Sequence, residues 1–224
     1  MAIVSYVFLA LFFISSAVHL YHSWKDDSKK RAITKPMLLL FLIGFYVFAA
    51  DKSNISVVLI VALATSWLGD VLLIPKGNGW FTAGGISFLI SHLTFIAVYV
   101  TNIDFAKVNW FITVPVAIVY YFIAFKIIMA VKANTPKIMV VPMYLYLLAN
   151  STMNVFALMQ LLCNPCLATA LAYAGAILFF ASDCTLFLVR YHENKNIIFK
   201  RHFTVMLTYV LGEFLITLGI LLLK

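Results

Sequence analysis

Residues 166–190 of the chain read CLATALAYAGAILFFASDCTLFLVR. This run is longer than the ~20 residues that an α-helix needs to cross a hydrocarbon core ~30 Å thick. Its charged residues are Arg190, at its end, and Asp183, in its interior. The run therefore predicts a membrane-spanning helix that carries an acid within the membrane.

The composition extends this prediction to the whole chain. Hydrophobic residues make up 64% of the 224 residues and charged residues 11%, whereas about 25% of the residues in a soluble protein are charged. Lipid must therefore be the solvent for most of the surface. The net charge of +8 is spread between the apolar runs, so it indicates membrane topology and not a nucleic-acid-binding patch.

The apolar residues fall into eight runs, which predict an all-α bundle of eight transmembrane helices in a single domain, 1–224. The runs cover residues 2–24, 36–50, 55–74, 81–100, 109–129, 138–161, 166–190 and 203–223. Pro36 suits the first position of its helix, where no amide hydrogen is missed. Short connections favour antiparallel neighbours. The first run has no basic region before it, so we expect a retained helix and not a signal peptide.

The basic residues predict how the bundle is oriented. Thirteen of the 16 lie in or beside alternate connections: Lys25, Lys29, Lys30, Arg31, Lys35, Lys76, Lys126, Lys132, Lys137, Arg190, Lys195, Lys200 and Arg201. The opposite side has Lys52, Lys107 and Lys224. The positive-inside rule then predicts cytoplasmic odd-numbered connections and both termini on the non-cytoplasmic side. Such a chain suits a cell (inner) membrane, or the endoplasmic reticulum membrane if it is eukaryotic.

Three acids, Asp70, Asp183 and Glu213, lie inside apolar runs. A carboxylate at the centre of a membrane helix costs roughly 2.5–3.5 kcal/mol, so such groups usually face the bundle interior and pair with a partner. Asp70 and Asp183 both fall near the cytoplasmic end of their runs, within about one helical turn of the same depth. The alternative is that these acids only specify packing.

Other polar residues recur at helical spacing within the runs. Tyr146, Asn150 and Asn154 follow one another at four-residue intervals, Tyr209 shares a face with Glu213, and His92 lies in the middle of its run. Each alone is commonly a packing residue or a link between helices. Together with two aspartates, however, they predict a polar cavity.

Lys35 and the cysteine pair each have both a functional and an ordinary structural explanation. Lys35 at a helix start, beside free amide hydrogens, suits a phosphate group, although it is equally an ordinary positive-inside lysine. Cys163 and Cys166 form a C-x-x-C pair, which is weak support for a redox or metal site and fits turn residues or a local disulfide. Zinc normally takes four ligands, and no second cluster is visible, so no metal is predicted.

Several of these residues stand in distinctive motifs: Lys35-Pro36, Trp67-Leu68-Gly69-Asp70, Gly85 with Phe88, Ser91 and His92, and Ala181-Ser182-Asp183-Cys184-Thr185-Leu186. In this order the motifs resemble the YhhN-like lysoplasmalogenase family, and the resemblance covers essentially the whole chain. One departure stands in the last run. Where the family has a Tyr–small–Gln pattern, this chain has Tyr209-Val210-Leu211-Gly212-Glu213.

The resemblance implies hydrolysis of the vinyl ether bond of lysoplasmalogens, which yields a fatty aldehyde and glycerophosphocholine or glycerophosphoethanolamine. It also implies that Asp70 and Asp183 are catalytic. The chemistry agrees, because protonation of the vinyl ether β-carbon followed by attack of water needs a proton donor and a carboxylate. Two carboxylates in a low-dielectric pocket do not both ionise easily, so one is expected to hold its proton.

The expected site also contains supporting residues: Lys35 for the phosphate, and His92, Tyr146, Asn150, Tyr209 and Glu213 around the cavity. The expected partners are a lysophospholipid and the bilayer, with no cofactor or metal. A proton-coupled transporter or lipid carrier is the alternative function, since buried Asp and His also mark proton relays. A membrane protein without chemistry is a third.

Overall fold

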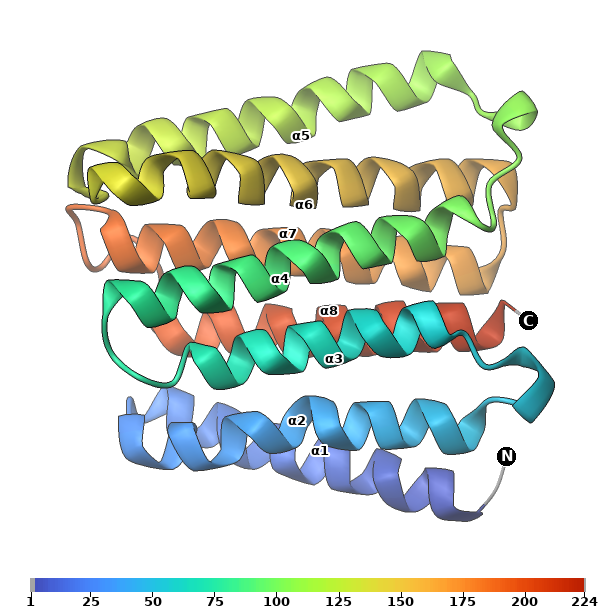
Figure 1. Cartoon of the computed structure of the whole chain (residues 1–224), viewed down its shortest axis with the longest axis horizontal. Coiled ribbons are helices and arrows are strands. Elements are labelled where there is room, and N and C mark those ends of the chain that lie inside the picture. The colour runs from blue at the N-terminus through green and yellow to red at the C-terminus, as the bar shows by residue number, and fades with distance from the viewer. Residues whose placement is uncertain (1–2, 224) are drawn as a thin grey trace.

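The computed structural model describes residues 3–223, and these form an all-α bundle (Figure 1). The eight α-helices are α1 (Ile3–Trp24), α2 (Ser28–Ala49), α3 (Val57–Leu72), α4 (Asn78–Val100), α5 (Trp110–Val131), α6 (Lys137–Cys163), α7 (Leu167–Tyr191) and α8 (Arg201–Leu222). Single turns of 3-10 helix lie at Lys52–Asn54, Phe105–Lys107 and Lys132–Asn134. Ala2, the predicted start of the first helix, and Lys224 lie outside the described residues.

The helices alternate in direction, so α1 begins and α8 ends at the same end of the bundle (Figure 1). The connections that carry most of the basic residues lie at the opposite end. Seven helices are long and apolar enough to cross a membrane, and α3, with 16 residues, is shorter. Large apolar side chains also face outward, as on α5, where Phe111 is 94% exposed and Ile118 is 62% exposed. The chain is therefore a polytopic membrane protein.

The second helix begins earlier than its apolar run predicted. It starts at Ser28, and Asp27 caps it by accepting a hydrogen bond from the Lys30 amide at 3.2 Å. That hydrogen bond, together with the Lys30 ammonium group, holds the pKa of Asp27 below its usual value. The basic segment that resembled a loop is thus the first two turns of α2. Long basic side chains reach water from a helix end, so charge alone does not end a helix.

Pro36 consequently lies inside α2 and not at its first position, so that prediction was wrong. Proline has no N–H to donate to the carbonyl four residues earlier, which belongs to Ala32. Here α2 is tied to α3, because the Trp67 indole donates a hydrogen bond to the Pro36 carbonyl at 2.9 Å. The Lys35-Pro36 and Trp67–Asp70 motifs therefore meet in space.

Helices α7 and α8 form the most extensive contact between any two elements. Glycines make it close: a Cβ atom on Gly175 would lie 2.6 Å from the Gly212 carbonyl oxygen, and one on Gly212 would lie 2.9 Å from the Gly175 carbonyl oxygen. Further along the same contact, a Cβ atom on Gly219 would meet the Ala168 carbonyl oxygen at 2.5 Å. The two backbones touch, as small residues allow in membrane bundles.

Substitution of Gly212 by valine should therefore destabilise the protein. The added side chain meets backbone atoms of α7, which cannot rotate aside, so α7 and α8 must separate. We expect the melting temperature in detergent, measured by fluorescence, to fall by several degrees for Gly212→Val. The control is Gly79→Val, because a Cβ atom on Gly79 has no neighbour within 4 Å. Equal melting temperatures for the two variants would contradict this account of the interface.

Candidate active site

Asp70, in the last turn of α3, and Asp183, on α7, line one cavity of about 330 Å³. The two side chains are nearly inaccessible, with 1% of Asp70 and 4% of Asp183 exposed. The cavity lies at the end of the bundle that carries the basic connections, and residues of α1, α2, α3, α4, α7 and α8 line it. The predicted match in depth of the two acids thus corresponds to a shared space.

Asp70 is held by two helices other than its own. Its Oδ1 atom lies 3.0 Å from Lys35 Nζ on α2, and its Oδ2 atom accepts a hydrogen bond from the Tyr209 hydroxyl on α8 at 2.8 Å. Lys35 is therefore the counter-ion of Asp70 as well as a lining residue of the cavity. A buried carboxylate with a cation and a hydroxyl donor can stay ionised within the membrane.

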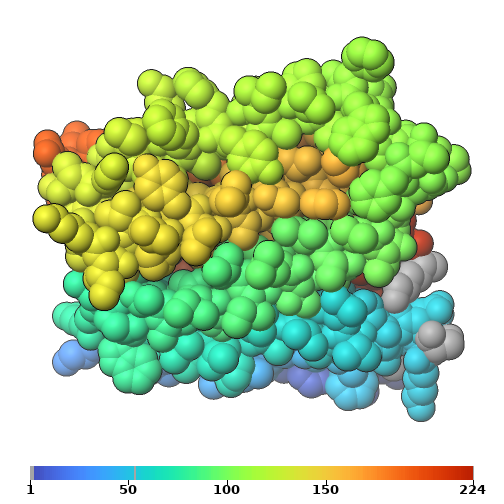
Figure 2. Space-filling model, turned by 45° about the horizontal axis from the view of Figure 1, so that its top comes forward, coloured from blue at the N-terminus to red at the C-terminus, as the bar shows by residue number. Residues whose placement is uncertain are grey.

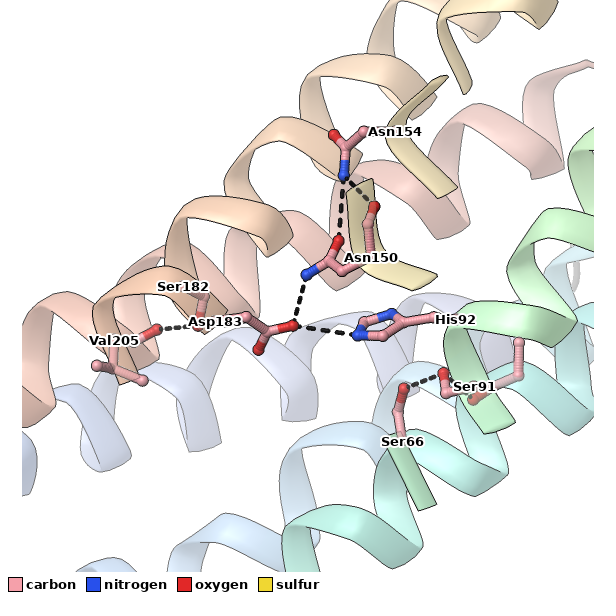
Figure 3. Close-up of polar contacts among 9 residues, drawn as sticks. Ser66, Ser91, His92, Asn150, Asn154, Ser182, Asp183 and Val205 are labelled. Carbon is pink, nitrogen blue, oxygen red and sulfur yellow. Dashed lines mark hydrogen bonds and ion pairs between the residues drawn. The ribbon is translucent and has the colours of Figure 1, made fainter. Parts of the chain in front are cut away.

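Asp183 has a different set of partners (Figure 3). Its Oδ2 atom lies 3.1 Å from His92 Nε2 on α4 and accepts a hydrogen bond from Asn150 Nδ2 on α6 at 2.6 Å. Asn154 in turn donates to the Asn150 side-chain oxygen at 3.1 Å. The polar stripe predicted on α6 is thus a chain of amides that ends on a carboxylate. No lysine or arginine forms an ion pair with Asp183 within the described residues.

His92 and Tyr146 stand behind Asp183 and do not line the cavity. The His92 ring packs edge-on against Tyr146, with 5.1 Å between the centroids, and against Phe179, with 4.9 Å. Tyr146 itself lies next to Asp183. These side chains fix the position of the carboxylate, while Asp183 alone of this group reaches the cavity.

Glu213, expected in the cavity, is placed apart from it. It is fully buried on α8, one turn beyond Tyr209, and does not line the cavity. Ser66 lies beside its carboxyl group, and Ser66 is hydrogen-bonded to Ser91 at 2.7 Å. Neither Glu213 oxygen has a hydrogen bond of good geometry within the described residues.

The cavity also contains cations for which the sequence predicted only a role in topology. Arg31 of α2, Lys76 of the α3–α4 connection and Arg190 of α7 line it, as do His19 and His202. The Arg190 guanidinium stacks on the Phe81 ring at 3.8 Å and donates a hydrogen bond to the Tyr191 hydroxyl at 3.0 Å. Their place in the sequence could have indicated this, because charges in connections at one end of a bundle can converge on a single cavity.

Cys163 and Cys166 do not line the cavity of the two carboxylates. Cys163 donates a hydrogen bond to the Asp104 carbonyl at 3.4 Å, and Cys166 caps α7, where hydrogen bonds from Thr169 hold the pKa of the Cys166 thiol below its usual value. Both are free thiols. Across residues 3–223, no group of three His, Cys, Asp or Glu side chains is placed to hold a metal ion.

The fold and the cavity together define a polytopic membrane protein with two carboxylates at an intramembrane polar site. The sequence profile of the YhhN family matches residues 30–220, and the chain belongs to that family. The family includes lysoplasmalogenases. No curated protein and no solved structure matches the chain.

Replacement of Lys35 by methionine should leave Asp70 buried without its cation. Breaking a buried pair from one side typically costs about 3–5 kcal/mol, so the melting temperature of Lys35→Met in detergent should fall clearly. The double variant Lys35→Met/Asp70→Asn should recover part of that loss, because no charge is then left unpaired.

The matched control is Lys30→Met, whose ion pair with Asp27 is exposed and long, at 3.8 Å. Such surface pairs contribute about 0–1 kcal/mol, so its melting temperature should stay close to that of the wild type. A double variant as unstable as Lys35→Met would show that the two charges do not compensate each other.

Proposed function

We propose that the protein is a lysoplasmalogenase, which hydrolyses the vinyl ether bond of alkenyl lysophospholipids within the membrane. The observation that carries this proposal is the shared cavity of Asp70 and Asp183, in which the two carboxylates have unlike partners. Membership of a family that includes lysoplasmalogenases supports it. Pairs of carboxyl groups in unlike surroundings divide the roles of acid and base in many hydrolases.

The proposed reaction needs one proton and one water. A carboxylic acid donates its proton to the β-carbon of the vinyl ether, and the C=C electron pair forms the new C–H bond. This leaves an oxocarbenium ion at the carbon that bears the ether oxygen. Water adds there and loses a proton to a carboxylate, and the resulting hemiacetal collapses to a fatty aldehyde and the glycerophospho-head group. The chemistry itself requires no metal or organic cofactor.

The partners of the carboxylates suggest how the roles divide. Asp70 has the Lys35 ammonium group at 3.0 Å, so its ionised form is compensated, and we assign it the stabilisation of the oxocarbenium ion and the orientation of water. Asp183 has the neutral Asn150 amide and the His92 ring as partners, and we assign it the delivery of the proton. Tyr209, Asn150, His92 and Tyr146 act as positioning residues. Glu213 has no assigned role.

The head group would lie among the cations of the cavity. Arg31, Lys76 and Arg190 lie around the two carboxylates together with Lys35, and a phosphate of glycerophosphocholine or glycerophosphoethanolamine carries the complementary charge. Arginine suits such a group because its planar fork of N–H donors matches the oxygens of a phosphate.

The basic end of the bundle would face the cytoplasm. Under the positive-inside rule, this orientation places both termini on the non-cytoplasmic side and the cavity near the cytoplasmic surface. The membrane would be a cell (inner) membrane, or that of the endoplasmic reticulum in a eukaryotic source.

Release of long-chain aldehyde from lysoplasmenylethanolamine by the purified protein tests the proposal. Asp70→Asn and Asp183→Asn should each lower the rate by roughly 10²–10⁴-fold, which is the usual contribution of general acid–base catalysis. The matched control is Asp51→Asn, because Asp51 is exposed and its side chain makes no capping hydrogen bond. Elution of all variants as folded protein in size-exclusion chromatography is the structural check.

Two results would contradict the proposal. Undiminished aldehyde release by both folded aspartate variants would remove the carboxylates from the mechanism. Absence of aldehyde from the folded wild type, combined with lipid or proton flux in liposomes, would favour a carrier that uses the same buried groups.

Substitution of Lys76 by glutamine should weaken binding of the head group. Lys76 is exposed at the cavity, so its loss should raise KM severalfold with little change in kcat, as expected for removal of uniform binding. The difference should shrink at high salt because an exposed charge is screened. Lys132→Gln, which removes an exposed charge outside the cavity lining, is the control. An equal KM for the two variants would place the head group elsewhere.

A further inference from the structure

A second cavity, of about 270 Å³, lies beside the first and is almost wholly apolar. We call it the α4–α6 groove, because residues of these two helices form its sides and residues of α7 its floor. Along α4 it extends from Phe81 to Leu89, a distance of about 12 Å at 1.5 Å per residue. No charged residue lines it.

The groove opens on the lipid-facing surface of the bundle. Its outer residues are exposed, with Ile86 on α4 at 52% and Leu145 on α6 at 51%, while Tyr146 at its inner end is buried. Figure 2 shows this face, on which α4 and the first half of α6 lie side by side. The groove therefore leads from the hydrocarbon region of the membrane toward the interior of the bundle.

The inner end of the groove adjoins the cavity of the two carboxylates. Four side chains, Leu73, Phe81, Phe88 and Leu186, line both spaces. Tyr146, which lines the groove, also lies next to Asp183. An apolar site reached from lipid and a cationic site reached from the end of the bundle thus share one wall.

We propose that the α4–α6 groove binds the hydrocarbon chain of a single-chain lipid whose phosphate lies among the cations of the neighbouring cavity. This inference rests on the proposed function and adds the route and position of the chain to it. In a lysoplasmalogen the vinyl ether is the junction of chain and head group. A chain in the groove and a head group in the cavity place that junction at the shared wall, beside Asp183.

The groove would position the lipid chain more than it would strengthen the binding of the lipid. A chain that moves from lipid into an apolar groove gains no hydrophobic free energy, because lipid tails are as apolar as leucine side chains. Packing against the walls instead fixes how far the chain enters, and this sets the register of the reacting carbon against the carboxylates. A change in the groove should consequently alter rate and chain-length preference more than binding.

Gly85 provides a direct test of this idea. It lines the groove, and a Cβ atom built on it has no neighbour within 4 Å. Gly85→Leu should thus fold while its side chain occupies the groove. Gly79→Leu is the matched control, since Gly79 lies on the same helix, has the same open surroundings and does not line the groove.

We expect Gly85→Leu to release aldehyde from a long-chain lysoplasmenylethanolamine about ten-fold more slowly than the wild type, the scale of a misfit in an apolar pocket. Its rate with a short-chain analogue and the rates of Gly79→Leu with both lipids should stay within about two-fold. An equal loss with both chain lengths, or no loss, would overturn the groove proposal while leaving the hydrolase intact.

A second measurement does not depend on hydrolysis. The probe is a 1-O-alkyl lysophospholipid, whose saturated ether has no vinyl bond to protonate, with a photoreactive diazirine in the chain. Cross-links mapped by mass spectrometry should fall on α4 and α6 residues of the groove, decrease in Gly85→Leu and be displaced by unlabelled lysolipid. Such cross-links in a wild type that releases no aldehyde would support chain binding in the groove and contradict the proposed hydrolase activity.

The remaining results identify other occupants and would overturn the proposal. Competition by a two-chain phospholipid as strong as that by lysolipid would make the groove an ordinary contact with bilayer lipid. A change of oligomeric state in Gly85→Leu, with no change in cross-linking, would make it a contact between two copies of the chain.

Discussion

The carboxyl groups of Asp70 and Asp183 need hydrogen-bond or charged partners inside a membrane, and most of the bundle is organised around that requirement. Asp70 on α3 takes its partners from α2 and α8, and Asp183 on α7 takes its partners from α4 and α6. Six of the eight described helices therefore meet at one carboxylate or the other. A charge in hydrocarbon is tolerated when partners surround it, so the same contacts that hold the helices together also prepare the site.

The unlike partners of the two acids follow from where their helices lie. Asp70 lies next to α2, whose first turns carry the basic residues of a membrane boundary, so a lysine reaches it. Asp183 faces the amides of α6 and the imidazole of α4, deeper in the packing, where no lysine or arginine pairs with it within the described residues. The close glycine contact between α7 and α8 holds the helix of Asp183 beside the helix of Tyr209, so both carboxylates open on one space.

The sequence predicted the eight helices because a membrane helix is defined by length and apolarity, which are local properties. It misplaced the start of α2 because a basic segment was taken to be a connection, although Asp27 is a good capping residue. Helical periodicity also put Glu213 on the face of Tyr209. Periodicity gives the face of a helix but not the extent of a cavity along it, and the cavity ends before Glu213.

The partners inside the site were less accessible to prediction. A polar cavity follows from several polar residues in apolar runs, but the pairing of Asp70 with Lys35 and of Asp183 with His92 depends on which helices are neighbours. The place of Arg31 and Arg190 in the cavity was not predicted for another reason. Positive charges at the ends of membrane helices already have an explanation in topology. The structure shows that both line one cavity, and this placement is the basis of the head-group role proposed for them.

The shortness of α3 places the two carboxylates close to water at one end of the bundle as well as to the lipid-facing groove. Its 16 residues span about 24 Å, less than the ~30 Å thickness of a hydrocarbon core. Since Asp70 lies in its last turn, this carboxylate lies near the end of the bundle at which the basic residues gather. The proposed hydrolysis of a membrane lipid would need water and a charged head group from the aqueous side and a hydrocarbon chain from the lipid side. In the proposed reaction, a helix that ends early beside a groove that opens sideways would allow the head group and the chain to reach the same carboxylate pair, and the head group would not have to cross the membrane.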